Sequence, residues 1–429
     1  MARSEFQTLP GTRDLTEPES GRTRRLVQVF AEEADRAGFG QIVPPMFEDV
    51  GVFVRLGEAS DVVSKELYSF EDKGGRQIAL RPEFTASVCR SFAQLRPLIP
   101  WKTWYAGPNF RYDKPQKGRY RQFDQVGAEV IGSNDPDVDV ELIALAWRFY
   151  QRLGLTGVTL LLNTLGDFAE RPVYLDALRT YFEKNREDLS EQSLATMAVN
   201  PLRVLDSKRR QDQAIVAEAP VIVDYLSDDA AAAFERVQQG LKALGVPFEL
   251  APRLVRGLDY YTRTTFEYVA TGLDAAQTAI GGGGRYDGLV EALGGPPEPG
   301  VGFALGVDRT LLACDAEEVF GPAATDVDVW VVATTPGTEA LELAEELRVA
   351  GIRVDRSYAG PEGGPRSMKA QMKAANRSGA RIAVIVGEEE LEAGSVSLRM
   401  LRATDDSDEP QQALVARSQV VQKILEKVR

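Results

Sequence analysis

The chain has 429 residues, 44% hydrophobic and 27% charged, which is enough for two or three globular domains, and it shows neither an apolar run long enough to span a membrane nor a secretory signal. Its net charge of −14 argues against general nucleic-acid binding, although local basic patches can still bind RNA. It contains two cysteines and no histidine, so we expect no disulfide framework, no zinc site and a cytoplasmic location, and catalysis must use other side chains or the substrate.

The first part of the chain is predicted to be mixed α/β. Residues 19–39 have helical spacing and meet a glycine stop at Gly38, and residues 41–49 read as a strand broken by Pro44 and Pro45. Residues 76–95 read as a strand that leads into a helix. Residues 101–113 and 120–132 then read as two strands joined by a tight hairpin loop.

The middle of the chain changes character. Residues 167–247 are rich in Ala, Leu, Glu, Lys and Arg with helical patterning, which predicts an inserted helical domain. Strand character returns over residues 256–272. It is followed by the glycine-rich "GGGGRYDG", which reads either as a flexible loop or as a flat backbone wall beside a substrate, and by a strand and helix in "GVGFALGVDRTLL".

The last part, residues 326–429, alternates strand, helix, strand and helix. That order predicts a small βαβ-type domain with a parallel or mixed sheet. Residues 412–428 read as a closing helix. Residues 1–166 and 248–320 would then form the first domain around the helical insertion.

The hairpin "FRYDKPQKGRYRQFDQVGAEVIG" carries the strongest functional signal. Its tip holds the positive charges of Arg111, Lys114, Lys117, Arg119 and Arg121 against the single acid Asp113. In a strand, residues of one parity share a face, so Phe123, Gln125, Gly127 and Glu129 lie in one row while Val126, Ala128 and Val130 face a core. The row favours a ligand site; the alternative is an amphipathic strand with a solvated face.

Other segments carry weaker signals. Glu83 and Thr85 lie two residues apart at a probable strand end, where they can receive an ammonium group or simply lie on the surface. Arg256 precedes Gly257, which would let the backbone approach a ligand, whereas the neighbouring pair Tyr260 and Tyr261 is more typical of packing. Arg309 lies at the start of a helix, a position suited to a phosphate.

A basic stripe marks the last domain. Arg366, Lys369, Lys373, Arg377 and Arg381 follow one another at helical spacing, with no acid between Arg366 and Val386. The stripe reads either as a docking surface for an anion or as a solvated helix face.

Taken in order, "LRPEFTASVCR", the hairpin, "LNTLGD", "NPLRVLDSK", "VRGLDYYTRTTFE", "GGGGRYDGLV" and "GFALGVDRTLL" resemble the histidyl-tRNA synthetases, which are class II aminoacyl-tRNA synthetases, over nearly the whole chain. The resemblance implies an α/β (α+β) fold: an antiparallel-sheet catalytic domain (1–166 and 248–320), a helical insertion (167–247) and a C-terminal α/β anticodon-binding domain (326–429). It also implies a homodimer, with Pro45 near the interface.

The same resemblance implies a role for each site residue. The catalytic pair would be Arg111 and Arg256, acting on the α-phosphate of ATP. The ATP site would comprise Arg111, Asp113, Phe123 and Arg309, and the histidine site Glu83, Thr85, Gln125, Glu129, Tyr260 and Tyr261. The tRNA would contact Gln116, Lys117, Arg119, Arg121, Lys369 and Lys373. The sequence departs from the commoner family pattern at Phe84, Asp113 and Asp124.

The implied reaction joins L-histidine to its tRNA through a histidyl-adenylate, with Mg²⁺ entering with ATP and no metal site on the protein. Arg111 and Arg256 would neutralise charge that develops on the α-phosphate. Two rivals lack this activity: the synthetase-like regulatory subunit of ATP phosphoribosyltransferase, which has no C-terminal domain, and a synthetase-like RNA sensor. The substrate would bring the only imidazole to the site.

Overall fold

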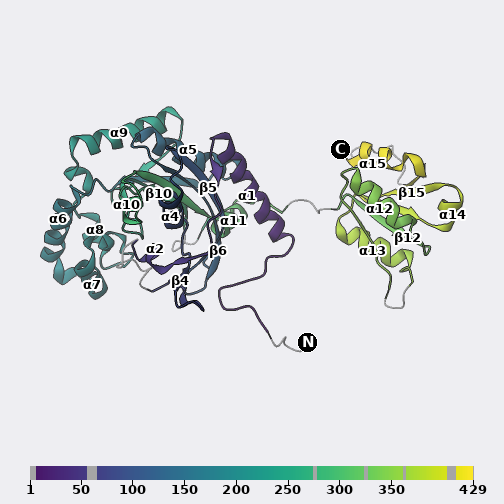
Figure 1. Cartoon of the computed structure of the whole chain (residues 1–429), viewed down its shortest axis with the longest axis horizontal. Coiled ribbons are helices and arrows are strands. Elements are labelled where there is room, and N and C mark those ends of the chain that lie inside the picture. Colours follow the sequence, from purple (N-terminus) through teal and green to yellow (C-terminus); the bar gives the residue numbers. More distant parts are fainter. Residues whose placement is uncertain are drawn as a thin grey trace. The chain divides into compact units, whose positions relative to one another are not determined.

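The computed structural model describes residues 6–55, 65–273, 278–322, 327–360, 364–402 and 412–428, which belong to two compact units, Met1–Gly321 and Pro322–Arg429 (Figure 1). Among these residues, no helix is both long and apolar enough to cross a bilayer.

The first unit is built on an eight-stranded sheet. Its central strands are antiparallel neighbours, and each edge carries one short parallel strand. In spatial order the strands are β1 (Gly40–Gln41), β5 (Trp101–Phe110), β6 (Gln122–Ile131), β11 (Gly300–Gly306), β10 (Ala279–Arg285), β9 (Thr262–Ala270), β7 (Val158–Thr164) and β8 (Glu249–Leu250). This arrangement confirms the predicted antiparallel-sheet fold class.

Helices cover one face of this sheet and bury its main core. These are α1 (Glu19–Arg36), α5 (Pro136–Arg152) and α9 (Asp228–Ala243), whose apolar sides pack on Trp104, Val126, Ala128 and Val130. Pro136 at the first turn and the Asp135 carboxylate, which accepts from the Asp137 amide at 3.0 Å, fix the start of α5.

The opposite face carries a second, smaller core and the functional residues. It is covered by α2 (Val50–Val54), α4 (Thr85–Leu95), α10 (Leu289–Ala292) and a three-stranded sheet of β2 (Phe47–Asp49), β4 (Gln77–Leu80) and β3 (Ser69–Glu71). Helix α11 (Val307–Ala316) follows β11 directly, as the sequence predicts.

The glycine run is not a loop, contrary to the first of the two interpretations. It forms β10, where the lack of Cβ atoms lets neighbouring groups come close. A Cβ on Gly283 would lie 2.0 Å from the Gly302 carbonyl oxygen, and one on Gly282 would lie 2.6 Å from the Arg256 guanidinium. The alternative interpretation as a backbone wall remains open.

The helical segment consists of α6 (Arg171–Lys184), η1 (Arg186–Asp188), α7 (Glu191–Val199), η2 (Pro201–Asp206), α8 (Gln213–Ala217) and η3 (Ile222–Tyr225), followed by α9. The elements before α9 bury a hydrophobic cluster of their own, centred on Tyr174, Leu178 and Phe182. Helix α9 instead packs into the main core through Phe234, Val237 and Leu241. The assignment of residues 167–247 to a separate domain stays a prediction.

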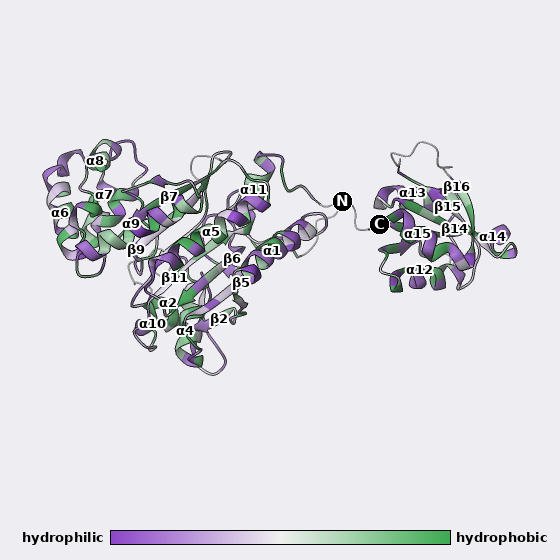
Figure 2. Ribbon diagram, turned by 90° about the horizontal axis from the view of Figure 1, so that it is seen from above, coloured by the Kyte–Doolittle hydropathy of each residue, from purple (hydrophilic) through white to green (hydrophobic). Residues whose placement is uncertain are grey.

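The second unit is a mixed five-stranded sheet with helices. Its strands lie in the order β13 (Val354–Arg356), β12 (Val329–Ala333), β14 (Ile382–Val386), β15 (Ser395–Met400) and β16 (Gln412–Ala416), and its helices are α12 (Glu339–Val349), α13 (Met368–Ser378), α14 (Glu388–Glu392) and α15 (Val420–Val428), with η4 (Arg417–Gln419) before α15. Figure 2 shows the hydrophobic β14 within this unit and the hydrophilic α14.

The predicted closing helix over residues 412–428 is wrong in its first part. Gln412–Ala416 forms β16, because alternate residues there are half-buried and pair with β15, and α-helix begins only at Val420.

Candidate functional site

The hairpin of β5 and β6 places the predicted row of side chains as its parity requires. Glu129 pairs with Thr103, Gly127 with Tyr105 and Gln125 with Gly107. The Arg111 amide continues the ladder by donating to the Arg121 carbonyl at 2.9 Å. The opposite face of β6 lies in the main core, as predicted.

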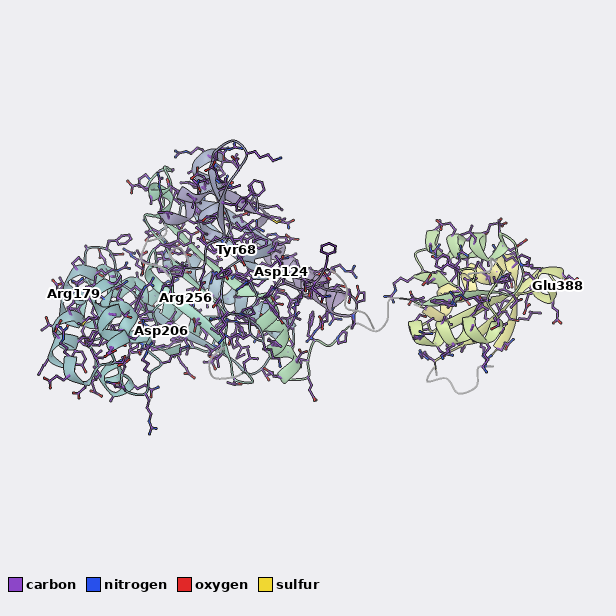
Figure 3. The ribbon with its side chains drawn as sticks, turned by 90° about the horizontal axis from the view of Figure 1, so that it is seen from below. Tyr68, Asp124, Arg179, Asp206, Arg256 and Glu388 are labelled. Carbon is purple, nitrogen blue, oxygen red and sulfur yellow. The ribbon has the colours of Figure 1, made fainter. Side chains whose placement is uncertain are left out.

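A cavity of about 820 Å³ opens beside this row. Strand β6 contributes Phe123 and Gln125 to its wall, and the end of β5 leads into Arg111. The backbone of Gly281 and Gly282 in β10 forms another side, which supports the interpretation of the glycine run as a backbone wall. Residues of α7 and η2 also line the cavity, among them Asp206, which Figure 3 shows beside Arg256.

Three arginines from distant parts of the sequence converge on this cavity: Arg111, Arg256 and Arg309. Arg111 donates from Nε to the Pro82 carbonyl at 2.9 Å, and its guanidinium carbon lies 5.4 Å from the centre of the Phe123 ring. Arg309 donates to the carbonyls of Gly118 at 3.1 Å and Ala279 at 2.9 Å. Backbone carbonyls accept from both side chains, which fixes the two guanidinium groups at the cavity wall, a placement suited to phosphate.

Arg256 has a different environment. Its Nη1 lies 2.5 Å from Glu267 Oε2, and its buried Nε has no hydrogen-bond partner among the described residues. Gly282 makes room for the guanidinium, since a Cβ there would lie 2.6 Å from Arg256 Nη1, whereas the space around Gly257 is open within 4 Å. A buried donor that is unsatisfied at a cavity wall is typical of a group that binds a ligand.

Glu129 lies fully buried below the cavity and is surrounded by hydroxyl groups. Thr85 Oγ1 donates to Oε1 at 2.8 Å, Tyr105 Oη to Oε1 at 3.0 Å, and Tyr286 Oη to Oε2 at 2.8 Å. Burial raises the pKa of Glu129 to about 8, although these hydrogen bonds oppose the shift. Glu129 is therefore a protein group whose raised pKa makes it a candidate to titrate beside any imidazole that a substrate brings.

The sequence predicts Glu83 and Thr85 at a strand end, but Thr85 is the first residue of α4 and Glu83 lies two residues before it. The two Glu83 oxygens accept from the amides of Thr85 at 2.7 Å and Ala86 at 2.8 Å, so the carboxylate satisfies donors at the helix N-terminus. Burial raises the pKa of Glu83 despite these bonds.

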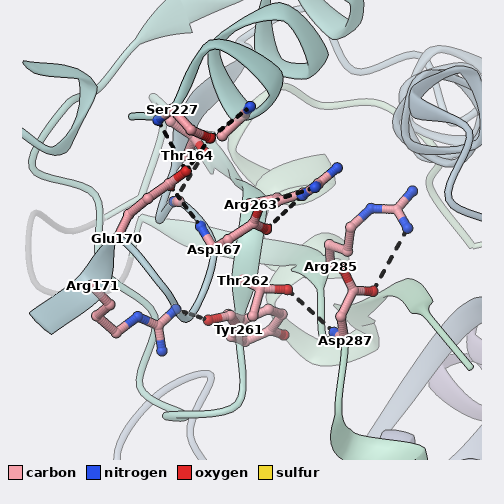
Figure 4. Close-up of polar contacts among 12 residues, drawn as sticks. Thr164, Asp167, Glu170, Arg171, Ser227, Tyr261, Thr262, Arg263, Arg285 and Asp287 are labelled. Carbon is pink, nitrogen blue, oxygen red and sulfur yellow. Dashed lines mark hydrogen bonds and ion pairs between the residues drawn. The ribbon is translucent and has the colours of Figure 1, made fainter. Parts of the chain in front are cut away.

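Tyr260 and Tyr261 precede β9 and are both buried, with ring centroids 4.6 Å apart. In Figure 4, Arg171 of the helical segment reaches the Tyr261 carbonyl, and Thr262 Oγ1 accepts from the Asp287 amide. The guanidinium carbon of Arg256 lies 5.9 Å from the centre of the Tyr261 ring. The segment before β9, which carries Arg256 and both tyrosines, is therefore held in part by Arg171 of the helical segment.

The predicted tRNA contacts lie in two places. On the hairpin, Gln116, Lys117 and Arg119 are exposed, while Arg121 stacks its guanidinium 3.9 Å from the centre of the Tyr112 ring. Arg119 also forms an ion pair with Asp113, with Nη1 and Oδ2 2.8 Å apart.

The second place is α13 in the C-terminal unit. Lys369, Lys373 and Arg377 lie in this helix with exposed side chains. Arg366 precedes the helix, and Arg381 follows it and donates to the Lys427 and Val428 carbonyls, both at 3.0 Å. Three of the five basic residues of the stripe therefore lie in one helix.

Sequence reasoning missed three polar residues of this site. Tyr105 and Asn109, which donates to Gln125 Oε1 at 2.6 Å, share the Arg111 face of β5, so strand parity could have found both. Tyr286, which follows β10, gave no such signal. Among the described residues, no group of three His, Cys, Asp or Glu side chains could hold a metal ion.

Comparisons with known proteins agree with this geometry. The family model described as histidyl-tRNA synthetase matches residues 11–310, and that described as anticodon binding domain matches residues 326–427. The histidine–tRNA ligase of Streptomyces coelicolor is 48% identical over 415 residues, covering 94% of this chain and 95% of the relative. That of Geobacillus thermodenitrificans is 44% identical over 414 residues, covering 94% and 96%.

Solved structures give the same picture. The crystal structure of apo histidyl-tRNA synthetase from S. aureus aligns with a TM-score of 0.80 at 33% identity, covering 98% of this chain and 99% of that one. An ATP phosphoribosyltransferase regulatory subunit/histidyl-tRNA synthetase from Bacillus halodurans C aligns at 0.65 and 20% identity, covering 90% and 99%, which shows likeness of fold alone.

Proposed function

Because the chain belongs to the histidyl-tRNA synthetase family, we propose that the cavity of the first unit binds ATP and that the buried Glu129 network beneath it binds L-histidine. The reaction is ATP-dependent attachment of histidine to its tRNA. The observation that carries the site assignment is the convergence of Arg111, Arg256 and Arg309 on one cavity with Phe123 and Gln125.

In the first step, the histidine carboxylate attacks the α-phosphorus of ATP, a P–O bond forms, and pyrophosphate leaves. Arg111 and Arg256 stabilise the negative charge that grows on the α-phosphate oxygens. Arg309, at the start of α11, binds the γ-phosphate, and the Phe123 ring stacks on adenine. Asp113 lines the same cavity and completes the proposed ATP site. Alignment of the two substrates supplies much of the remaining acceleration.

Mg²⁺ enters with ATP in this proposal. Mg²⁺ commonly takes one or two protein carboxylates together with substrate phosphates, and Asp113 and Glu267 both line the cavity. Because these are single carboxylates and not a preformed cluster, the phosphates must supply ligands of their own.

The histidine side chain is read by Glu129 and Tyr261, and its α-amino group by Glu83, Thr85 and Gln125, with Tyr260 closing the pocket. In the second step, a ribose hydroxyl at the tRNA 3′ end attacks the carbonyl of the adenylate, and AMP leaves. The basic hairpin tip at Gln116, Lys117, Arg119 and Arg121 binds the acceptor end. Translation enzymes of this kind act in the cytoplasm, where we place this one.

An ATP–pyrophosphate exchange assay tests the proposed function. We expect exchange that requires L-histidine and Mg²⁺ and proceeds without tRNA, followed by transfer of labelled histidine to tRNA. The non-catalytic rival, a regulatory subunit of ATP phosphoribosyltransferase, would bind histidine without exchange. The match of residues 326–427 to an anticodon binding domain favours the synthetase.

We also propose that Lys369, Lys373 and Arg377 contact the phosphates of the tRNA. Replacing all three by glutamine is expected to raise the KM for tRNA and to reduce the slope of log KM against log salt. With fewer phosphate contacts, binding of the tRNA releases fewer counterions. Pyrophosphate exchange should stay at the wild-type rate, since that step needs no tRNA. A salt slope equal to that of the wild type would show that these side chains are merely solvated.

A homodimer through the three-stranded sheet is the third part of the proposal. Phe47 pairs with Leu80 and Phe70 with Ile78, so these four side chains share one face of the sheet. Phe47 is 58% exposed and Phe70 is 48% exposed, so the face is apolar and open to solvent in the single chain.

We expect Phe47→Asp to shift the protein from dimer to monomer in sedimentation velocity, because a charge on that face would have to be desolvated at the interface. Phe168→Asp, which changes another half-exposed phenylalanine in the helical segment, is the matched control and should leave the dimer intact. An unchanged sedimentation coefficient in Phe47→Asp would exclude this face as the interface.

A further inference from the structure

The ring of Phe84 is the middle of a buried three-layer stack. The ring lies parallel to that of Tyr105, with centroids 4.2 Å apart and an interplanar angle of 10°. On its other side, the guanidinium carbon of Arg81 lies 4.0 Å from the Phe84 ring centre. All three side chains are buried.

Arg81 is itself held rigidly. Its Nε donates to the Pro108 carbonyl at 2.9 Å, and its Nη1 donates to the carbonyls of Pro44 at 2.7 Å and Pro45 at 3.2 Å. Strand β5 leaves space for the stack at Gly107, where a Cβ would lie 3.2 Å from Arg81 Nη2 and 3.6 Å from Phe84 Cζ. The backbone around Pro44 and Pro108 thus fixes the outer layer.

Tyr105, the inner layer of the stack, contacts Glu129, the carboxylate proposed to bind the histidine side chain. Tyr105 Oη lies 3.0 Å from Glu129 Oε1 and 3.2 Å from the Phe303 carbonyl oxygen. With one ring face covered by Phe84, Tyr105 cannot tilt toward that side without losing the stack. Its hydroxyl is therefore kept against Glu129.

We propose that Phe84, backed by Arg81, is a positioning residue that sets the orientation of Glu129 through Tyr105, and so contributes to the affinity for the imidazole ring. This inference rests on the proposed role of Glu129 in binding histidine. Phe84 is not among the residues that line the cavity, so in this proposal it acts through the tyrosine.

Phe84→Leu tests the inference, because it keeps most of the buried volume and removes the flat ring. Loss of an aromatic pair predicts a Kd for histidine raised about 3- to 10-fold in calorimetry, with the Kd for ATP unchanged. Phe92→Leu is the matched control: Phe92 is buried in the same cluster, but its ring packs on Trp101, away from Glu129. It should lower the melting temperature without changing the Kd for histidine.

Tyr105→Phe provides the second measurement. It keeps the stack and removes the hydroxyl, so the double variant Phe84→Leu/Tyr105→Phe should bind histidine no more weakly than Tyr105→Phe alone. If Phe84→Leu does not fold, Arg81→Lys removes the flat guanidinium at the same charge and is subject to the same comparison.

Equal effects of Phe84→Leu and Phe92→Leu on histidine binding, or additive effects in the double variant, would overturn the positioning role. A wild-type protein that neither binds histidine nor exchanges pyrophosphate would instead contradict the proposed function itself.

Discussion

Arg256→Ala is expected to slow histidine-dependent pyrophosphate exchange by about 10²- to 10³-fold, the usual cost of removing one donor from developing charge. Its guanidinium lies at the cavity wall, with one buried nitrogen unpaired among the described residues and another on Glu267. The Kd for histidine should change little, because the interaction gains strength mainly in the transition state.

Single-turnover adenylate formation measures this effect without the tRNA step. Gly282→Ala is an independent test, because its Cβ would lie 2.6 Å from Arg256 Nη1 and 2.7 Å from the Phe266 carbonyl oxygen, which forces the guanidinium to move. Gly40→Ala is the control, since a Cβ on that strand glycine meets no atom within 4 Å. Near-normal exchange in Arg256→Ala would remove Arg256 from the catalytic pair.

Glu129→Gln is expected to weaken histidine binding by about 10- to 150-fold, which corresponds to a charge-assisted hydrogen bond of about 1.5–3 kcal/mol. ATP binding should be nearly unaffected, because Glu129 lies in the buried network and not in the lining of the ATP cavity. Calorimetric titration of each ligand separates the two cases. Equal weakening of both ligands would mean that Glu129 only supports the fold.

The pH dependence of histidine binding supplies a second signature of Glu129. Its raised pKa of about 8 keeps it neutral in the empty pocket below that pH. Free imidazole is neutral above about pH 6.5. Between these values, carboxyl and imidazole together bring the one proton that the bound pair shares, so affinity should be highest there. Below the window the pair carries one proton too many, and above it one too few.

Affinity should therefore fall on both sides, by up to about tenfold per pH unit. In Glu129→Gln the alkaline limb should disappear while the acid limb, which belongs to the substrate, remains. With a triazole analogue of histidine the acid limb should disappear instead. An alkaline limb that persists in Glu129→Gln would assign it to another group.

The face of a strand on which each side chain lies is a local property, and it could be predicted from the sequence alone. The alternation in β6 placed Phe123, Gln125 and Glu129 on one face and Val126, Ala128 and Val130 in the core, because successive strand side chains point to opposite sides whatever the partner strand is. The order of β12, α12, β13, α13 and β14 in the C-terminal unit followed from hydrophobic periodicity, whereas α14, β15 and β16 were not predicted; family resemblance supplied the roles.

The tertiary structure decided what depends on groups far apart in the sequence. The glycine run became a strand because it pairs with β9 and β11, and glycine fits there because Arg256 and the Gly302 carbonyl occupy the space that side chains would need. Gln412–Ala416 became a strand because β15 offers an edge to pair with. The raised pKa of Glu129 depends on its complete burial among residues from α4, β5 and the segment after β10. Burial and close approach arise from the packing of distant segments, and no local pattern encodes them.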